Sequence, residues 1–145
     1  MAVIPTRPLS GSFGLSRRRV RSGESVLRFA LRADATLCGG LGLLVAMAAD
    51  PLSRLSGLPA TTEWILGAGF VAYGALLYLL AGVDDIRRIG LGNVAASLAF
   101  AIAVVAVLIA GVLPLTGIGV AMTLATTLAT LGFAYLQYLG VRRLA

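Results

Sequence analysis

The longest uncharged segment of this chain covers residues 89–141, 53 residues between Arg88 and Arg142 without an Asp, Glu, Lys or Arg side chain. An α-helix rises about 1.5 Å per residue, so a bilayer core of about 30 Å takes roughly 20 residues. The segment is too long for one membrane span and long enough for two. Pro114, with Gly111 and Gly117 on either side, predicts a turn between the two spans. We therefore expect a helical hairpin inserted in a membrane.

Two further apolar stretches precede this hairpin, and together the four segments predict an all-α fold, a four-helix transmembrane bundle with short loops. The transmembrane domain is expected to cover residues 25–145, with helices at residues 27–49, 63–83, 91–113 and 117–140. Ser25 is the expected N-cap of the first helix, and Thr61 or Thr62 that of the second. Asp50-Pro51 is expected to end the first helix, because the residue before a proline avoids the helical region.

Composition excludes several classes of function. Charged residues make up 12% of the chain, against about 25% in a soluble domain, and four spans leave no room for a soluble catalytic domain. The chain has no histidine, which excludes a haem held by paired imidazoles and any histidine-based metal site. Cys38 is the only cysteine, so it forms no internal disulfide and is expected to pack as a small apolar residue. We expect no enzyme, no cofactor and no metal.

The first 24 residues are rich in Pro, Gly, Ser and Arg, and they contain Arg17–Arg19 and Arg21. We expect residues 1–24 to form a disordered, basic cytoplasmic tail on anionic lipid, each arginine contributing about 1 kcal/mol near the surface. A mitochondrial presequence is an alternative, since no acid precedes Glu24. No aromatic residue lies among the clustered arginines, so we expect no nucleic-acid partner.

The arginines also predict how the chain is oriented. Seven precede the apolar core of the first helix, two lie in the 83–90 loop, and two follow the last helix, whereas only Arg54 lies in the 50–62 loop. This asymmetry of 11 to 1 predicts that both termini are cytoplasmic. All twelve basic residues are arginine and none is lysine, which is typical of a GC-rich genome. We therefore expect a multi-pass protein of the bacterial cytoplasmic (inner) membrane.

Polar residues of three helices fall at the same depth near the cytoplasmic side. The candidate polar cluster consists of Arg32, Asp34, Asn93, Ser97 and Gln137. An ionisable residue inside a membrane indicates a functional site by default, and a short aspartate needs a partner or water there. Two interpretations are open. The cluster either fixes the register of the helices through hydrogen bonds, which we prefer, or forms a shallow pocket for a lipid headgroup or small ligand.

The fourth helix carries a stripe of small and mildly polar residues spaced three and four apart. The stripe consists of Thr116, Gly119, Thr123, Thr127, Thr130, Ala134 and Gln137. Gly39 and Gly42 in the first helix and a ladder of Ala95, Ala99 and Ala103 in the third are the expected counterparts. Small residues let helices approach closely in lipid, and threonines supply hydrogen bonds between helices. We expect helix packing, with a threonine-lined polar path as the alternative.

Four motifs occur in order over residues 25–145. They are Leu31-Arg32-Ala33-Asp34-Ala35, Gly57-Leu58-Pro59, Gly92-Asn93 with Ser97, and residues 133–140 (FAYLQYLG) followed by Arg142-Arg143. These motifs resemble a family of small, uncharacterised four-helix integral membrane proteins of high-GC bacteria. The family pattern has a tryptophan where this chain has Ala96. The resemblance implies the topology and carries no activity.

These observations predict a small integral membrane protein that acts as an accessory or structural subunit through helix–helix contacts. Its expected partners are the lipid bilayer and either a larger membrane complex or further copies of itself in a homo-oligomer. The alternative is a small-solute or lipid-binding transporter with a shallow polar pocket in the inner leaflet. Asp84-Asp85 is the one pair of adjacent acids, and with Arg87 and Arg88 it predicts a self-neutralised turn rather than a catalytic site.

Overall fold

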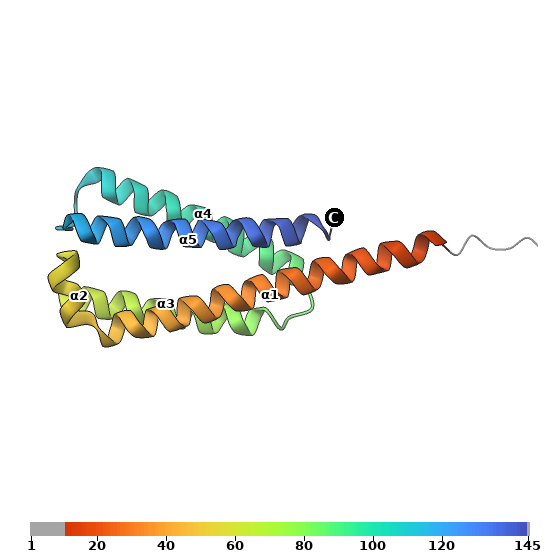
Figure 1. Cartoon of the computed structure of the whole chain (residues 1–145), viewed down its shortest axis with the longest axis horizontal. Helices are drawn as coiled ribbons and strands as arrows, with labels where there is room; N and C mark the ends of the chain where they lie inside the picture. Colours follow the sequence, from red (N-terminus) through yellow and green to blue (C-terminus); the bar gives the residue numbers. More distant parts are fainter. Residues whose placement is uncertain (1–10, 145) are drawn as a thin grey trace, which may run out of the picture.

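The computed structural model describes residues 11–144, with the side chains of residues 22–144. Five helices and no strand occur in this part of the chain. The helices are α1 (Gly11–Met47), α2 (Ala49–Ser56), α3 (Ala60–Leu80), α4 (Ile86–Ala110) and α5 (Gly117–Arg142) (Figure 1). Residues 22–47 of α1, together with α3, α4 and α5, are long and apolar enough to cross a membrane. The expected all-α fold with four spanning helices is confirmed.

The first helix begins much earlier than expected. Residues 11–24 were expected to belong to a disordered tail, but α1 starts at Gly11; residues 1–10 of the expected tail lie outside the described part. Ser25 is therefore no N-cap: its hydroxyl donates to the Ser22 carbonyl oxygen (3.0 Å) inside the helix. No proline lies between Pro8 and Pro51, and arginine is a good helix former, so nothing in this sequence ends the helix.

The short helix α2 was not expected. Pro51 does not end the helical path; it is the third residue of α2, in the first turn, where a missing backbone N–H costs no intrahelical hydrogen bond. The expected caps of the next helix are also wrong, since α3 begins at Ala60 behind Pro59 and places Thr61 and Thr62 inside its first turn. By contrast, α5 begins at Gly117 as expected.

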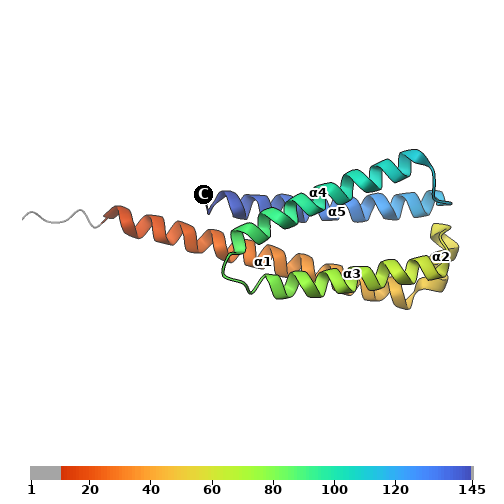
Figure 2. The ribbon, with the colours of Figure 1, turned by 180° about the vertical axis from the view of Figure 1, so that it is seen from behind.

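The four long helices form two pairs, α1 with α3 and α4 with α5, which lie side by side within each pair (Figures 1 and 2). Glycines bring the α1 and α3 backbones into contact. A Cβ atom at Gly67 would lie 2.5 Å from the Ala46 nitrogen, and one at Gly42 would lie 2.6 Å from the Gly67 carbonyl oxygen. A Cβ at Gly74 would lie 2.7 Å from the Gly39 nitrogen. Gly39 and Gly42 therefore both lie in the α1–α3 contact.

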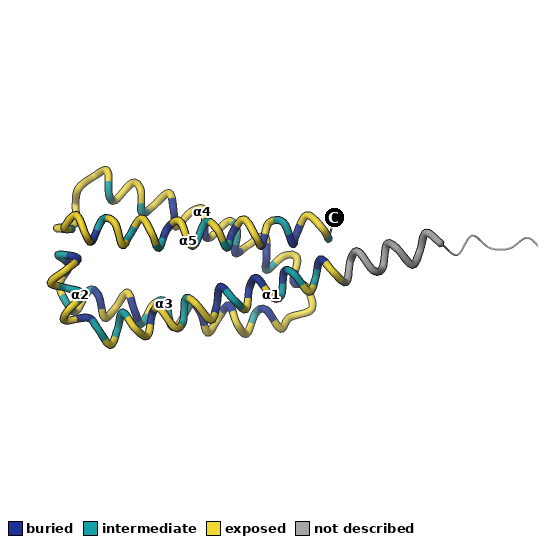
Figure 3. The backbone as a smooth tube through the Cα atoms, viewed as in Figure 1, coloured by how far each residue is buried: buried dark blue, intermediate teal, exposed yellow. Residues whose placement is uncertain are grey.

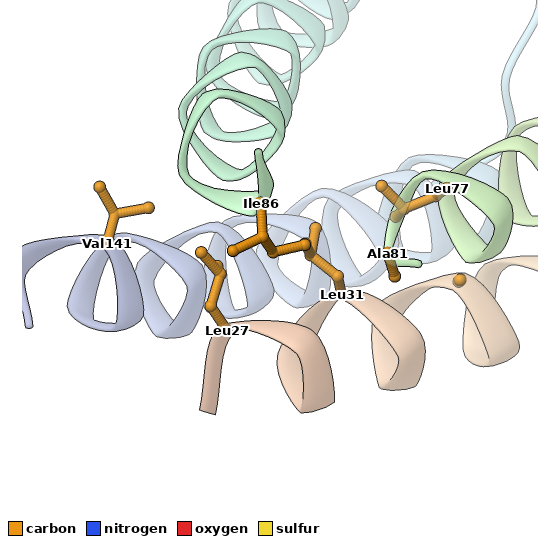
Figure 4. Close-up of a cluster of buried hydrophobic side chains, with 7 residues drawn as sticks. Leu27, Leu31, Leu77, Ala81, Ile86 and Val141 are labelled. Carbon is orange, nitrogen blue, oxygen red and sulfur yellow. The ribbon is translucent and has the colours of Figure 1, made fainter. Parts of the chain in front are cut away.

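The two pairs meet at both ends of the molecule. At the end where α3 stops and α4 begins, called here the C-terminal end, a buried apolar cluster joins all four long helices (Figure 4). The cluster consists of Leu27, Leu31, Ala35, Leu77, Ala81, Ile86 and Val141. At the opposite end, the α2 end, the Thr116 N–H donates to the Ser56 carbonyl oxygen (2.8 Å), and the Thr116 hydroxyl donates to the Leu55 carbonyl oxygen.

Gly57 shapes the α2 end through its backbone conformation. Its φ of 87° lies in the left-handed region, which a residue with a Cβ adopts only with strain. A Cβ at this position would also lie 2.2 Å from the Pro114 carbonyl oxygen, in the turn between α4 and α5. The Gly57-Leu58-Pro59 motif therefore lets the α2–α3 connection contact the α4–α5 turn directly.

Many large apolar side chains are exposed on the outside of the helices. Buried residues lie mainly where helices face one another (Figure 3). Ile109, Leu79 and Ile102 are 82%, 73% and 71% exposed. Exposure on this scale is unfavourable in water, whereas in a bilayer such side chains face lipid. The distribution of side chains is thus that of a multi-pass membrane protein.

Replacing Gly67 by Ala tests the contact between α1 and α3. The added methyl group meets the backbone at Ala46, which cannot move as a side chain would, so we expect the free energy of unfolding to fall by about 1–3 kcal/mol. Titration with sodium dodecyl sulfate in mixed micelles, followed by helical circular dichroism, measures the change. Gly69→Ala on the same helix is the matched control, because nothing lies within 4 Å of a Cβ there. Equal effects of the two variants would contradict the proposed contact.

Candidate functional site

Asp34 lies near the middle of the spanning part of α1 and is only 4% exposed. Its Oδ2 atom accepts hydrogen bonds from Gln137 Nε2 (2.9 Å) on α5 and from Asn93 Nδ2 (3.4 Å) on α4. Asn93 Nδ2 also donates to Gln137 Oε1 at 2.8 Å. A carboxylate group buried among apolar helices is costly without such donors. The structure thus brings three of the five residues of the candidate polar cluster into direct contact.

A fourth helix joins these residues through Tyr73 of α3, whose hydroxyl donates to Asn93 Oδ1 at 2.5 Å. We call Asp34, Tyr73, Asn93 and Gln137 the polar network. It contains one residue from each of the four spanning helices. No buried side-chain nitrogen or oxygen among the described residues lacks a hydrogen-bond partner, as the absence of water from a bilayer core requires.

The polar network lies well inside the spanning segments. Asn93 is seven residues after the start of α4, and Tyr73 is seven residues before the end of α3. At the rise of a helix, both lie about 10 Å from the C-terminal end of the molecule. Asp34 was expected at or just inside the membrane boundary, and its partners place it deeper.

Arg32 lies outside the polar network. Its side chain is exposed, and its guanidinium carbon lies 5.9 Å from the centre of the Tyr78 ring, in cation–π contact. Residues two apart on a helix point in different directions, so Arg32 and Asp34 do not share a face. The five-residue cluster was suggested because its members lie at equal depth in the membrane. Equal depth therefore does not bring Arg32 to the Asp34 carboxylate.

Ser97, one turn after Asn93, is 3% exposed and borders a cavity of about 430 Å³ between the spanning helices. The cavity is lined by Asp34 and Cys38 of α1; Ile65, Leu66, Gly69, Phe70 and Tyr73 of α3; Ala96, Ser97 and Phe100 of α4; and Thr130 of α5. Two members of the polar network, Asp34 and Tyr73, belong to its wall. One part of the wall is therefore polar, and most of the remainder is aliphatic or aromatic.

The cavity extends to the surface between α3 and α4. These helices pack little against each other, although Phe70 and Phe100 form an edge-to-face pair with ring centres 6.5 Å apart. Ile65 and Leu66 line the cavity and are nevertheless 59% and 45% exposed. These side chains lie on the part of the molecule that faces lipid, so the cavity is accessible from the bilayer side.

Cys38 has a polar neighbour as well as the expected packing environment. Its Sγ atom donates to Asp34 Oδ1 at 3.7 Å, and the side chain lines the cavity. Within residues 22–144, the one ion pair joins Arg88, in the first turn of α4, to Asp85 just before that helix (3.1 Å), where a self-neutralised turn was expected. In the same part of the chain, no three His, Cys, Asp or Glu side chains lie close enough together to hold a metal ion.

The small-residue stripe of α5 faces inward, since Gly119, Thr127, Ala134 and Gln137 are buried. Of the stripe's threonines, Thr116 forms an expected hydrogen bond to another helix, since its hydroxyl donates to the Leu55 carbonyl oxygen of α2. Thr123, Thr127 and Thr130 form none. The Thr123, Thr127 and Thr130 hydroxyls donate to the carbonyl oxygens four residues earlier, at 2.9, 2.8 and 3.0 Å. In apolar surroundings the nearest acceptor for a helical threonine is this carbonyl of its own helix.

The alanine ladder expected to pack in the bundle has the opposite orientation. Ala95, Ala99 and Ala103 of α4 are exposed. The inward face of α4 consists of Ile86, Gly90, Asn93, Ser97 and Ala101. Once Asn93 turns towards the other helices, the period of the helix places these alanines on the outside.

Tyr73 is the member of the polar network that the sequence analysis missed. Its hydroxyl is the one polar side-chain group in the apolar stretch from Ile65 to Leu77 of α3. Tyrosine usually finds a hydrogen-bond partner when its ring is buried, so this position was a usable signal.

In comparisons with known proteins, no family model matches the chain, and no curated protein or solved structure matches it.

Replacing Gln137 by Leu tests the polar network. The change removes a donor to Asp34 and an acceptor for Asn93, so we expect the free energy of unfolding to fall by about 1–3 kcal/mol. Thr126→Val on the same helix is the control, because that hydroxyl bonds only to the Met122 carbonyl oxygen of its own helix. Detergent unfolding of both variants measures the change. A loss no larger than that of Thr126→Val would show that the network contributes little to stability.

Proposed function

We propose that this protein binds a small, largely apolar molecule inside the bilayer, in the cavity beside Asp34. The observation that carries the proposal is the cavity itself. Its volume of about 430 Å³ falls in the range of small-molecule sites, roughly 300–1,000 Å³. Such sites combine mainly apolar walls with a few convergent polar groups, and here Asp34, Tyr73 and Ser97 supply those groups.

Structural hydrogen bonding between helices accounts for only part of this arrangement. A network that merely fixed helix register would work equally well in a filled interior, and protein interiors are normally close-packed. The open space beside a carboxyl group that already has partners in two other helices therefore supports a binding role. In this proposal the polar network holds Asp34 in place, and the neighbouring cavity takes the ligand.

The proposed location is the bacterial cytoplasmic membrane, with both termini in the cytoplasm. The arginine asymmetry supports this orientation, because Arg87, Arg88, Arg142 and Arg143 all lie at the C-terminal end and only Arg54 lies at the α2 end. The polar network is then in the inner half of the bilayer. At a depth of about 10 Å the ligand's polar group is in contact with acyl chains rather than headgroups.

An accessory or structural subunit is the second proposal. It is supported by the exposed face of Ala95, Ala99 and Ala103 on α4, since a surface of small residues allows a helix of another membrane protein to approach closely. Gentle extraction at native expression level, followed by native mass spectrometry, tests it. A defined protein partner would favour the accessory role, and a monomer carrying a bound small molecule would favour the cavity.

Protection of Cys38 tests ligand binding directly, because Cys38 lines the cavity and is the only cysteine of the chain. The full chain in zwitterionic nanodiscs is treated with methyl methanethiosulfonate, and intact mass measures the labelling rate. Neopentylbenzene, a small apolar probe, is expected to slow the labelling several-fold by occupying the cavity. An unchanged rate at saturating probe would contradict the proposed function.

A pair of substitutions on α4 provides the matched comparison for this assay. Ala96→Trp adds a large side chain to the cavity wall, so we expect it to abolish the protection by neopentylbenzene. Ala95→Trp adds the same side chain next to it, on the exposed face and outside the lining. Protection is expected to persist in Ala95→Trp, and its equal loss in both variants would mean that the probe does not act from the cavity.

A further inference from the structure

We propose, on the basis of the ligand-binding function above, that the bound molecule carries a positive charge and that Asp34 is its counter-ion. The ligand class is a hydrophobic monovalent cation, such as a protonated amine or a quaternary ammonium on an apolar body. Three features of the described residues support this assignment: the missing counter-charge of Asp34, the position of its second oxygen, and the aromatic side chains of the cavity.

The first feature is that none of the side chains of residues 22–144 forms an ion pair with Asp34. Its partners at Oδ2 are the neutral amides of Asn93 and Gln137. The nearest arginines along α1 have other contacts: Arg28 Nη1 donates to the Ala81 carbonyl oxygen (2.7 Å), and Arg32 lies over Tyr78. Amide donors orient a carboxylate group, but they leave its charge uncompensated, and charged groups in a membrane are normally paired.

The second feature is that the other carboxyl oxygen remains available. Within the described residues, Oδ1 receives a hydrogen bond from Cys38 Sγ alone, and at 3.7 Å this is a weak contact. A carboxylate oxygen has two lone pairs, so Oδ1 retains acceptor capacity. Asp34 and Cys38 both line the cavity, which places this capacity beside the open volume.

The third feature is the composition of the cavity wall. Phe70, Tyr73 and Phe100 line the cavity, and aromatic rings attract cations through their faces. Ile65 and Leu66 provide an aliphatic surface for an apolar body. A molecule with a positive group near Asp34 and an apolar remainder matches both parts of the wall, whereas an anion would meet the carboxylate without a compensating donor.

Two probes of the same shape test the charge of the ligand. Benzyltrimethylammonium and neopentylbenzene differ by one atom, a charged nitrogen in place of a carbon. Each is titrated against Cys38 labelling by methyl methanethiosulfonate in the wild type and in Asp34→Asn. Comparing the same two probes in both proteins cancels their different solubility in lipid. The preference for the cation is the ratio of the neopentylbenzene and benzyltrimethylammonium concentrations that halve the labelling rate. We expect this ratio to be about tenfold larger in the wild type than in Asp34→Asn, which is the effect of a hydrogen-bonded charged pair.

The outcomes separate this inference from the proposed function. If both probes protect Cys38 but the cation preference is the same in wild type and Asp34→Asn, the cavity binds ligands and the assignment of charge is overturned. If neither probe protects the wild type, the proposed function fails with it. Asp50→Asn, which removes an exposed acid from α2, is the control and is expected to keep the wild-type preference.

A second measurement on the wild type covers a failure of Asp34→Asn to fold. The labelling rates of Cys38 with 2-(trimethylammonio)ethyl and 2-sulfonatoethyl methanethiosulfonate are compared with the same two rates for free cysteine. A carboxylate 3.7 Å from the sulfur is expected to raise the cation-to-anion ratio by about tenfold over that of free cysteine. A ratio equal to that of free cysteine would overturn the inference.

Discussion

A bilayer core contains no water to solvate a carboxyl group. Asp34 therefore needs hydrogen-bond donors from other helices, and this need determines how the spanning helices are arranged. The hydrogen bonds that Asp34 needs come from Asn93 on α4 and Gln137 on α5, and Asn93 in turn accepts from Tyr73 on α3. Satisfying one acid therefore fixes the depth and rotation of four helices. Between the contacts at the two ends of the molecule, these hydrogen bonds tie the α1–α3 pair to the α4–α5 pair.

The number of spans was predictable because length and hydropathy alone decide it, and the joining of Asp34, Asn93 and Gln137 followed from their common depth. Helix ends were less predictable, since Pro51 fits a first turn as readily as it stops a helix. Arg32 was misplaced because depth does not specify direction around a helix. A shallow pocket beside the polar cluster was one of the two interpretations left open by the sequence. The size of the cavity and its aromatic wall could not be predicted, because they depend on how far α3 and α4 lie apart, and no residue pattern encodes that separation.

The helix contacts of this protein are of two kinds: a close backbone contact between α1 and α3, and a slight side-chain contact between α3 and α4 beside the cavity. The α1–α3 contact brings backbones together at Gly42, Gly67 and Gly74, and such a contact has little freedom to change. The contact between α3 and α4 is slight, and it includes the edge-to-face pair of Phe70 and Phe100. Asp34 therefore stands on a rigid pair of helices, while the space beside it is bordered by side chains that can rotate.

The opening between α3 and α4 determines whether a molecule would enter the cavity from the lipid or from water. The α2–α5 contacts lie at one end of the molecule and the buried apolar cluster at the other, so the exposed part of the cavity wall, which lies between them, faces acyl chains. A molecule that arrives by this route is drawn from the lipid, and its effective concentration is set by partition between membrane and water. Two compounds that fit equally well would then differ in apparent potency by the ratio of their partition coefficients, and adding empty vesicles would weaken both.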